Sequence, residues 1–248
     1  MCLPAAAAAQ EGRIAYSRSV TYDYELPEGM PERFRDQMPT GKVDELLMFF
    51  DANQSIMIAA PELERDESGM SERERRMEGF AMRMRMMSSS RSDQEELLGS
   101  YVDFATGAMT ETKDFLGREF LVVDERPTFA WTLGSEQRQY LDYVVQKATT
   151  EYEGRAVEAW FTMQIPVPGG PGPFGGLPGM ILLVSIGDGH TVYAASDVKT
   201  DGLAGYVIKE PIDGEVMTPE QYEDMVVEKL EELEMMQSNR GGNRRRPF

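Results

Sequence analysis

Apolar and polar positions alternate through most of the chain, a pattern that predicts β-strands. Between residues 12 and 26, apolar or aromatic side chains recur at even spacing over GRIAYSRSVTYDYEL, as in a strand with one buried face. Similar patterns predict strands at 43–50, 54–60, 101–105, 109–113, 118–123, 143–151, 155–163, 180–186 and 191–195. Short turn sequences such as Thr106-Gly107 and Glu153-Gly154 separate neighbouring strands. These connections favour an antiparallel meander over alternating strands and helices.

Two stretches follow helical periodicity instead. A charged, methionine-rich insertion at 62–98 contains the capping-box pattern Ser71-x-x-Glu74, and apolar side chains with helical spacing follow it at 72–87. Thr218 and Pro219 are a typical N-cap and first residue of a second helix at 219–236. We therefore expect a mainly β fold: a twisted antiparallel meander sheet or half-open barrel, with one inserted short helix and a C-terminal helix. A single domain would span residues 10–237.

Both ends of the chain are expected to lie outside that domain. Ala7-Ala8-Ala9 before Gln10 resembles a signal-peptidase site, so residues 1–9 are interpreted as the remnant of a signal peptide. The alternative is a disordered alanine-rich end. A signal peptide would place the protein in the periplasm or outside the cell. Residues 238–248 are rich in glycine, asparagine and arginine and are predicted to form a disordered basic tail.

Composition excludes several classes of function. Lys and Arg number 25 against 43 Asp and Glu, so the net charge is −18, which disfavours nucleic acid and anionic lipid as partners. No apolar run reaches the ~20 residues of a transmembrane helix. Cys2 and His190 are the sole cysteine and histidine. One chain therefore cannot form a disulfide framework, a Cys/His zinc site or an iron–sulfur cluster.

A glycine- and proline-rich segment separates two predicted strands. Residues 160–184 read WFTMQIPVPGGPGPFGGLPGMILLV. Pro166 ends the first strand because proline cannot donate to a β-ladder, and residues 169–176 allow close backbone approach. The segment has no titratable side chain. One interpretation is a structural crossover whose glycines adopt conformations closed to other residues; the other is a lip that binds a ligand or peptide.

In this segment the chain resembles the GLPGLI family, secreted proteins of Bacteroidota-type bacteria whose function is unknown. The name motif reads GLPGMI here, and similar elements include AWFTMQIP at 159–166 and GPF at 172–174. The residues that carry the resemblance are Trp160, Pro166, Pro173, Phe174, Gly176, Leu177, Pro178 and Gly179. The resemblance also suggests a strand at Trp131-Thr132-Leu133. Val145 stands where many family members have cysteine, so a thiol role could not operate here.

Candidate chemistry is sparse. Met82, Met84, Met86 and Met87 could hold a soft metal such as copper, because thioethers suit Cu(I). The alternatives are an adaptable apolar stripe or a methionine-lined surface that binds a partner. His190 lies in a predicted turn beside Asp188, where a histidine fits without any catalytic role.

These observations predict an exported, non-catalytic envelope protein that binds a partner protein, a peptide or an apolar ligand. A half-open barrel with a helix across its mouth would resemble lipoprotein-carrier folds, which makes an apolar cavity a specific expectation. Two alternatives remain: a copper-binding or stress protein that uses the Met82–Met87 segment, and a hydrolase that acts through His190.

Overall fold

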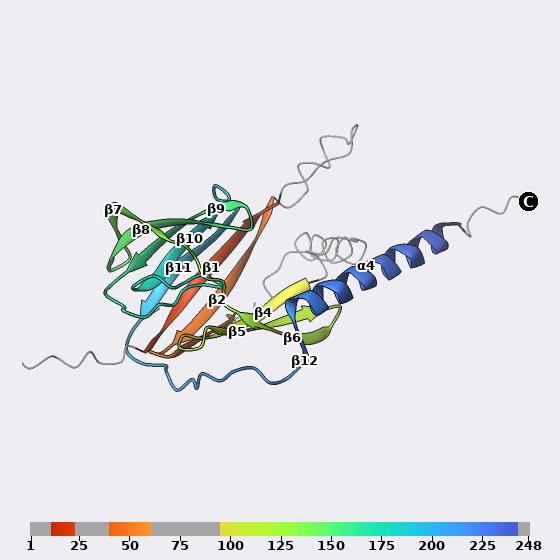
Figure 1. Ribbon diagram of the computed structural model, residues 1–248, viewed down its shortest axis with the longest axis horizontal. Coiled ribbons are helices and arrows are strands. Elements are labelled where there is room, and N and C mark those ends of the chain that lie inside the picture. Colours follow the sequence, from red (N-terminus) through yellow and green to blue (C-terminus); the bar gives the residue numbers. More distant parts are fainter. Residues whose placement is uncertain (1–10, 23–39, 61–94, 243–248) are drawn as a thin grey trace, which may run out of the picture. The chain divides into compact units, whose positions relative to one another are not determined.

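The structure is a computed structural model that describes residues 11–22, 40–60 and 95–242. It confirms a mainly β fold with a C-terminal helix (Figure 1). The elements are β1 Gly12–Thr21, β2 Gly41–Phe50, β3 Gln54–Ala59, β4 Glu95–Asp103, β5 Ala108–Phe115, β6 Arg118–Glu125, β7 Thr132–Tyr140, β8 Tyr143–Tyr152, β9 Arg155–Thr162, β10 Met180–Ile186, β11 Thr191–Lys199, β12 Glu215–Met217 and α4 Pro219–Gly242. The helix expected at 72–87 lies outside the described residues.

The strands form an open, mixed sheet of 12 strands in the order β12-β6-β5-β4-β3-β2-β1-β11-β10-β9-β8-β7. Sequential neighbours from β1 to β6 and from β7 to β11 confirm the predicted meander. The two runs join where β1 pairs antiparallel with β11. β12 pairs parallel with β6 and was not predicted, because three residues carry no periodicity. β7 is much longer than the short strand that the resemblance suggested.

The chain forms two compact units. The described part of the first comprises 11–22, 40–60, 100–109 and 125–210. The second comprises 95–99, 110–124 and 211–242. Each unit has a hydrophobic cluster of its own.

The first unit is built around alternating residues of β1. Ile14 and Tyr16 are fully buried and lie opposite Met48 and Leu46 of β2. The Tyr16 hydroxyl donates a 2.6 Å hydrogen bond to the carbonyl oxygen of Ile181. Burial raises the pKa of Tyr16 well above its ordinary value, so the phenol stays a neutral donor. This bond satisfies a polar group that would otherwise be costly to bury.

The second unit packs helix α4 on its strands. Tyr222 and Val226 of α4 are buried against a cluster formed by Phe115, Phe120 and Val122. The helix begins with a reciprocal capping box: Gln221 N donates to Thr218 Oγ1 at 3.2 Å, and Thr218 N donates to Gln221 Oε1 at 3.0 Å. The predicted N-cap is therefore confirmed. Among the described residues, no helix is both long and apolar enough to cross a membrane.

The end of α4 corrects the predicted boundary with the tail. The helix was expected to stop at 236, with disorder from 238 onward, but it continues to Gly242. Residues 229–237 are mainly Lys, Leu, Glu, Met and Gln, all strong helix formers, so they carry the helix onward until two successive glycines favour its end. Residues 243–248 of the predicted tail lie outside the described residues.

Replacing the N-cap tests the role of this helix start. Thr218→Ala removes the acceptor for Gln221 N and should lower the free energy of unfolding by about 1 kcal/mol. Urea titration followed by circular dichroism measures the change. Thr200→Ala, at an exposed threonine outside any helix or strand, is the control and should leave the midpoint almost unchanged. Equal effects from both substitutions would contradict the capping role.

Candidate binding site

Three neighbouring strands at the end of the sheet position the candidate site. Gln137 of β7 lies opposite Gln146 of β8, which in turn lies opposite Phe161 of β9. Directly opposed residues in antiparallel strands share a face, so these three side chains point to the same side of the sheet. Val144 lies two residues from Gln146 and therefore belongs to that face as well. The face bears both apolar and amide groups.

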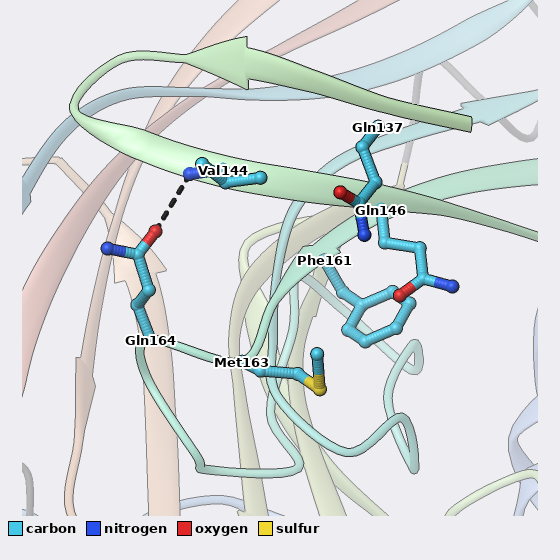
Figure 2. A pocket seen from close by; sticks show the side chains of 6 residues that line it. All are labelled: Gln137, Val144, Gln146, Phe161, Met163 and Gln164. Carbon is cyan, nitrogen blue, oxygen red and sulfur yellow. Dashed lines mark hydrogen bonds between the residues drawn. The ribbon is translucent and has the colours of Figure 1, made fainter. Parts of the chain in front are cut away.

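These residues enclose an open pocket of about 370 Å³, shown in Figure 2. It is lined by Gln137, Val144, Gln146, Phe161, Met163 and Gln164. Phe161 is buried, whereas Val144 and Met163 remain 50% and 60% exposed. None of the lining side chains is charged, in a chain whose residues are 27% charged. The pocket is thus an uncharged, largely apolar site on an acidic protein.

Hydrogen bonds hold two of the glutamines. Gln164 Oε1 accepts a 2.8 Å bond from the backbone N–H of Val144, drawn as a dashed line in Figure 2. Gln146 Nε2 donates to the carbonyl oxygen of Gly134 at 2.8 Å. Each bond uses one end of an amide; the Gln146 oxygen can serve a ligand, whereas the Gln164 nitrogen points away from Phe161 and Met163 in Figure 2. Held amides lose less conformational entropy on binding than mobile ones.

Sequence reasoning did not single out these residues. Glutamine has no distinctive chemistry, and Val144 and Phe161 fit any strand pattern. One signal was present: Gln146 alternates with Val144 and Ala148, so an amide falls within an otherwise apolar face of β8. The other lining residues, Met163 and Gln164, lie just after β9. Only the folded structure brings them to the pocket.

The glycine–proline segment has a structural role instead. Phe174 and Leu177 are buried in the main cluster, and the Phe174 ring stacks on Phe129 at 5.3 Å between centroids. Trp160 is also buried, Pro173 is half-buried, and Gly179 is buried. Pro166, Gly176 and Pro178 are exposed. The family-motif residues therefore supply core contacts and turns; none of them lines the pocket.

Two side chains hold this segment through its carbonyl groups. Arg126 donates to the carbonyl oxygens of Pro173 at 3.2 Å and Pro168 at 3.0 Å. Trp131 Nε1 donates to the carbonyl oxygen of Gly175 at 2.8 Å. Because the guanidinium is largely buried, the pKa of Arg126 falls to about 10. Because prolines have no backbone N–H, this segment cannot form a regular β-ladder. Side-chain donors therefore satisfy carbonyl oxygens that a ladder would otherwise pair.

The opposite face of the same strands carries a charged cluster around Trp160. The Arg138 guanidinium lies 3.9 Å from the centroid of the indole ring. Trp160 Nε1 donates to Glu158 Oε1 at 2.8 Å, and Lys147 Nζ lies 2.7 Å from Glu158 Oε2. The hydrogen bond from Lys147 is the main reason that the pKa of Glu158 lies below its ordinary value.

Among the other candidate residues, His190 does not line the pocket. His190 lies in the predicted hairpin turn, where its Nδ1 is 3.4 Å from Thr191 Oγ1. Asp188 and Gly189 beside it have positive φ angles of 54° and 92°. Met82, Met84, Met86 and Met87 lie outside the described residues, and copper binding stays a prediction. Within the described ranges, no three His, Cys, Asp or Glu side chains converge as a metal site.

Fold and site together define a class: an open, mainly antiparallel β-sheet protein with an uncharged pocket at one end of the sheet. Residues 150–183, which span β9 and the glycine–proline segment, match the family model described as "Protein of unknown function (Porph_ging)". This match contains the GLPGMI sequence but does not confirm the GLPGLI family by name. A search among curated proteins found no match.

Among solved structures, two of PNGF-II are similar in fold. The structure in space group P21 has a TM-score of 0.52 at 16% identity, and that in space group C2 has 0.51 at 17%. Each comparison covers 88% of this chain but only 33% of PNGF-II. The chain thus spans about a third of these structures, and identity this low indicates a shared fold alone.

Two glycines of the motif should differ in what they tolerate. A Cβ on Gly179 would overlap the carbonyl oxygen of Thr162, whereas Gly176 has open space but a φ of 79°. Gly179→Ala should lower the free energy of unfolding by about 2 kcal/mol or more. Gly176→Asn should cost less, because asparagine tolerates the left-handed region. Urea unfolding measures both, and the reverse order would contradict this account.

The charged cluster predicts a pH-dependent contribution to stability. Since the folded-state pKa of Glu158 is lowered, its contribution is present above the ordinary glutamate pKa and is lost as pH falls through the lowered value. A carboxyl NMR titration should show Glu158 protonating below the usual range. Lys147→Gln should move that pKa upward, and Arg138→Gln should move it less. An unchanged pKa in Lys147→Gln would remove the proposed cause.

Proposed function

We propose that this protein is a non-catalytic binding protein, exported to the cell envelope, and that the pocket on β7, β8 and β9 receives an apolar group of its ligand. The observation that carries this proposal is an uncharged pocket with exposed apolar side chains at its rim. Leu133, which lies opposite Ala148 on the same face of β7 and β8, is also 54% exposed. Exposed apolar side chains that gather around a cavity favour a binding surface.

The size and chemistry of the pocket support binding. Its volume of about 370 Å³ falls within the range of small-ligand sites. Contact with Phe161 and Met163 would remove apolar surface from water, at about 25 cal/mol per Å². The amide oxygen of Gln146 would orient a neutral polar group beside the apolar one. None of the lining side chains titrates, so the pocket offers no general acid or base.

The ligand class follows from these groups. A small apolar molecule, or an apolar side chain presented by a peptide or partner protein, matches the lining, whereas a charged group would lose hydration without gaining a counter-ion. Export remains a prediction from residues 1–9, which lie outside the described ranges. The copper-binding and hydrolase alternatives also remain predictions.

A neutral fluorescent dye tests the pocket directly. Nile red should bind the wild-type protein with increased emission, because the pocket excludes water from the dye. Val144→Asp should weaken binding about tenfold, because the carboxylate would be desolvated beside the dye. Val43→Asp is the matched control, since Val43 is also a strand valine and is 64% exposed.

The substitution Met163→Gln provides a second measurement without added charge, and it should also weaken dye binding. Circular dichroism establishes that each variant is folded. If Val144→Asp and Val43→Asp bind Nile red equally well, the pocket on β7–β9 is not the apolar site and the proposal fails.

A further inference from the structure

Strand β7 is an end strand with unpaired backbone groups. Among the described strands it pairs with β8 alone and lies at the end of the sheet (Figure 1). Alternate N–H and C=O groups of such a strand face away from the sheet. The register with β8 shifts between Leu133 and Gln137, and Gly134, Ser135 and Glu136 have no partner residue on β8. β7 is nine residues long, whereas β12 at the other end has three. The edge of β7 is therefore the larger template for another strand.

The sequence of this edge is complementary to itself. If two copies of β7 run antiparallel and Gln137 lies opposite Gln137 of the second copy, Glu136 lies opposite Arg138 of that copy, and Arg138 lies opposite Glu136. Directly opposed residues share a face, so both charge pairs are favourable. Leu133 near one end of β7 and Leu141 in the turn after its other end are 54% and 41% exposed.

Charge favours a second copy over an unrelated segment. Each chain carries a net charge of −18, so two copies repel over most of their surface. β7 holds one acid and one base, and its net charge is zero. The Glu136 carboxylate lies 3.6 Å from Lys147 Nζ. Because the Glu136 side chain is 67% exposed, an arginine of another chain can also reach it. A locally neutral strand with alternating charge is suited to pair with its own copy.

We propose that two copies of this chain associate through β7, antiparallel about a twofold axis at Gln137, so that the sheet continues from one copy to the other. The interface is isologous, and each copy contributes the same residues. Backbone hydrogen bonds supply attraction along the edge, and the Glu136–Arg138 pairs set the register. This proposal does not depend on a ligand in the pocket.

Sedimentation velocity at physiological ionic strength tests the association over a range of protein concentrations. The wild-type chain should dimerise reversibly. Glu136→Arg and Arg138→Glu should each weaken the dimer about tenfold, because like charges then face each other across the axis twice. The double variant Glu136→Arg/Arg138→Glu exchanges the two charges and should restore the dimer to near wild-type affinity.

A control variant distinguishes the effect of charge pairing across the interface from the effect of net charge on association. Glu119→Arg makes the same change in net charge at an exposed position of β6, and it should not weaken the dimer. Circular dichroism checks folding, and Glu136→Lys repeats the reversal with another cation. A chain that stays monomeric at all concentrations overturns the proposal. So does a dimer that resists both single reversals, or one that the double variant fails to restore.

Discussion

Antiparallel hydrogen bonding between β1 and β11 joins the two meanders of the sheet. These strands are separated by most of the chain, so their pairing carries a large loop-closure cost that local contacts cannot offset. Burial of Ile14 and Tyr16 and the bond from Tyr16 to Ile181 stabilise this junction. Without it, the meander β7–β11, which carries the pocket, would end at an unpaired β11 and would no longer continue the sheet of β1–β6.

The glycine–proline segment beside that junction cannot form a regular ladder of backbone hydrogen bonds. Its prolines have no N–H to offer a ladder, and its glycines bring the chain too close to β9 for any side chain at Gly179. Arg126 and Trp131 provide donors to the carbonyl oxygens that remain. The segment that carries the family resemblance is thus explained by folding requirements. This result favours the structural interpretation of the motif over a ligand-binding lip.

The end of the sheet combines features that a purely structural edge would not need. The face that carries Phe161 is left open around Val144 and Met163, while glutamines stand where further apolar side chains would close it. The opposite face holds Trp160 under Arg138, with Glu158 bound to Lys147. Along the edge itself, β7 carries balanced charges. The proposed ligand contacts side chains of this hairpin, whereas the proposed pairing uses the backbone edge of β7; Gln137 takes part in both, because it lines the pocket and lies at the proposed axis.

The sequence by itself determined the strands with clear alternation, their short turns and the start of α4 at Thr218, because these depend on neighbouring residues. It also located the unusual chemistry of the glycine–proline segment. It did not reveal most of β7, whose polar residues show no buried face, or β12, which is too short for a period. The pocket came only from tertiary structure, since Gln137, Gln146, Phe161 and Met163 meet through strand register. Register here depends on the turns between the strands and on the shift within β7, and the alternation of apolar and polar residues does not show that shift.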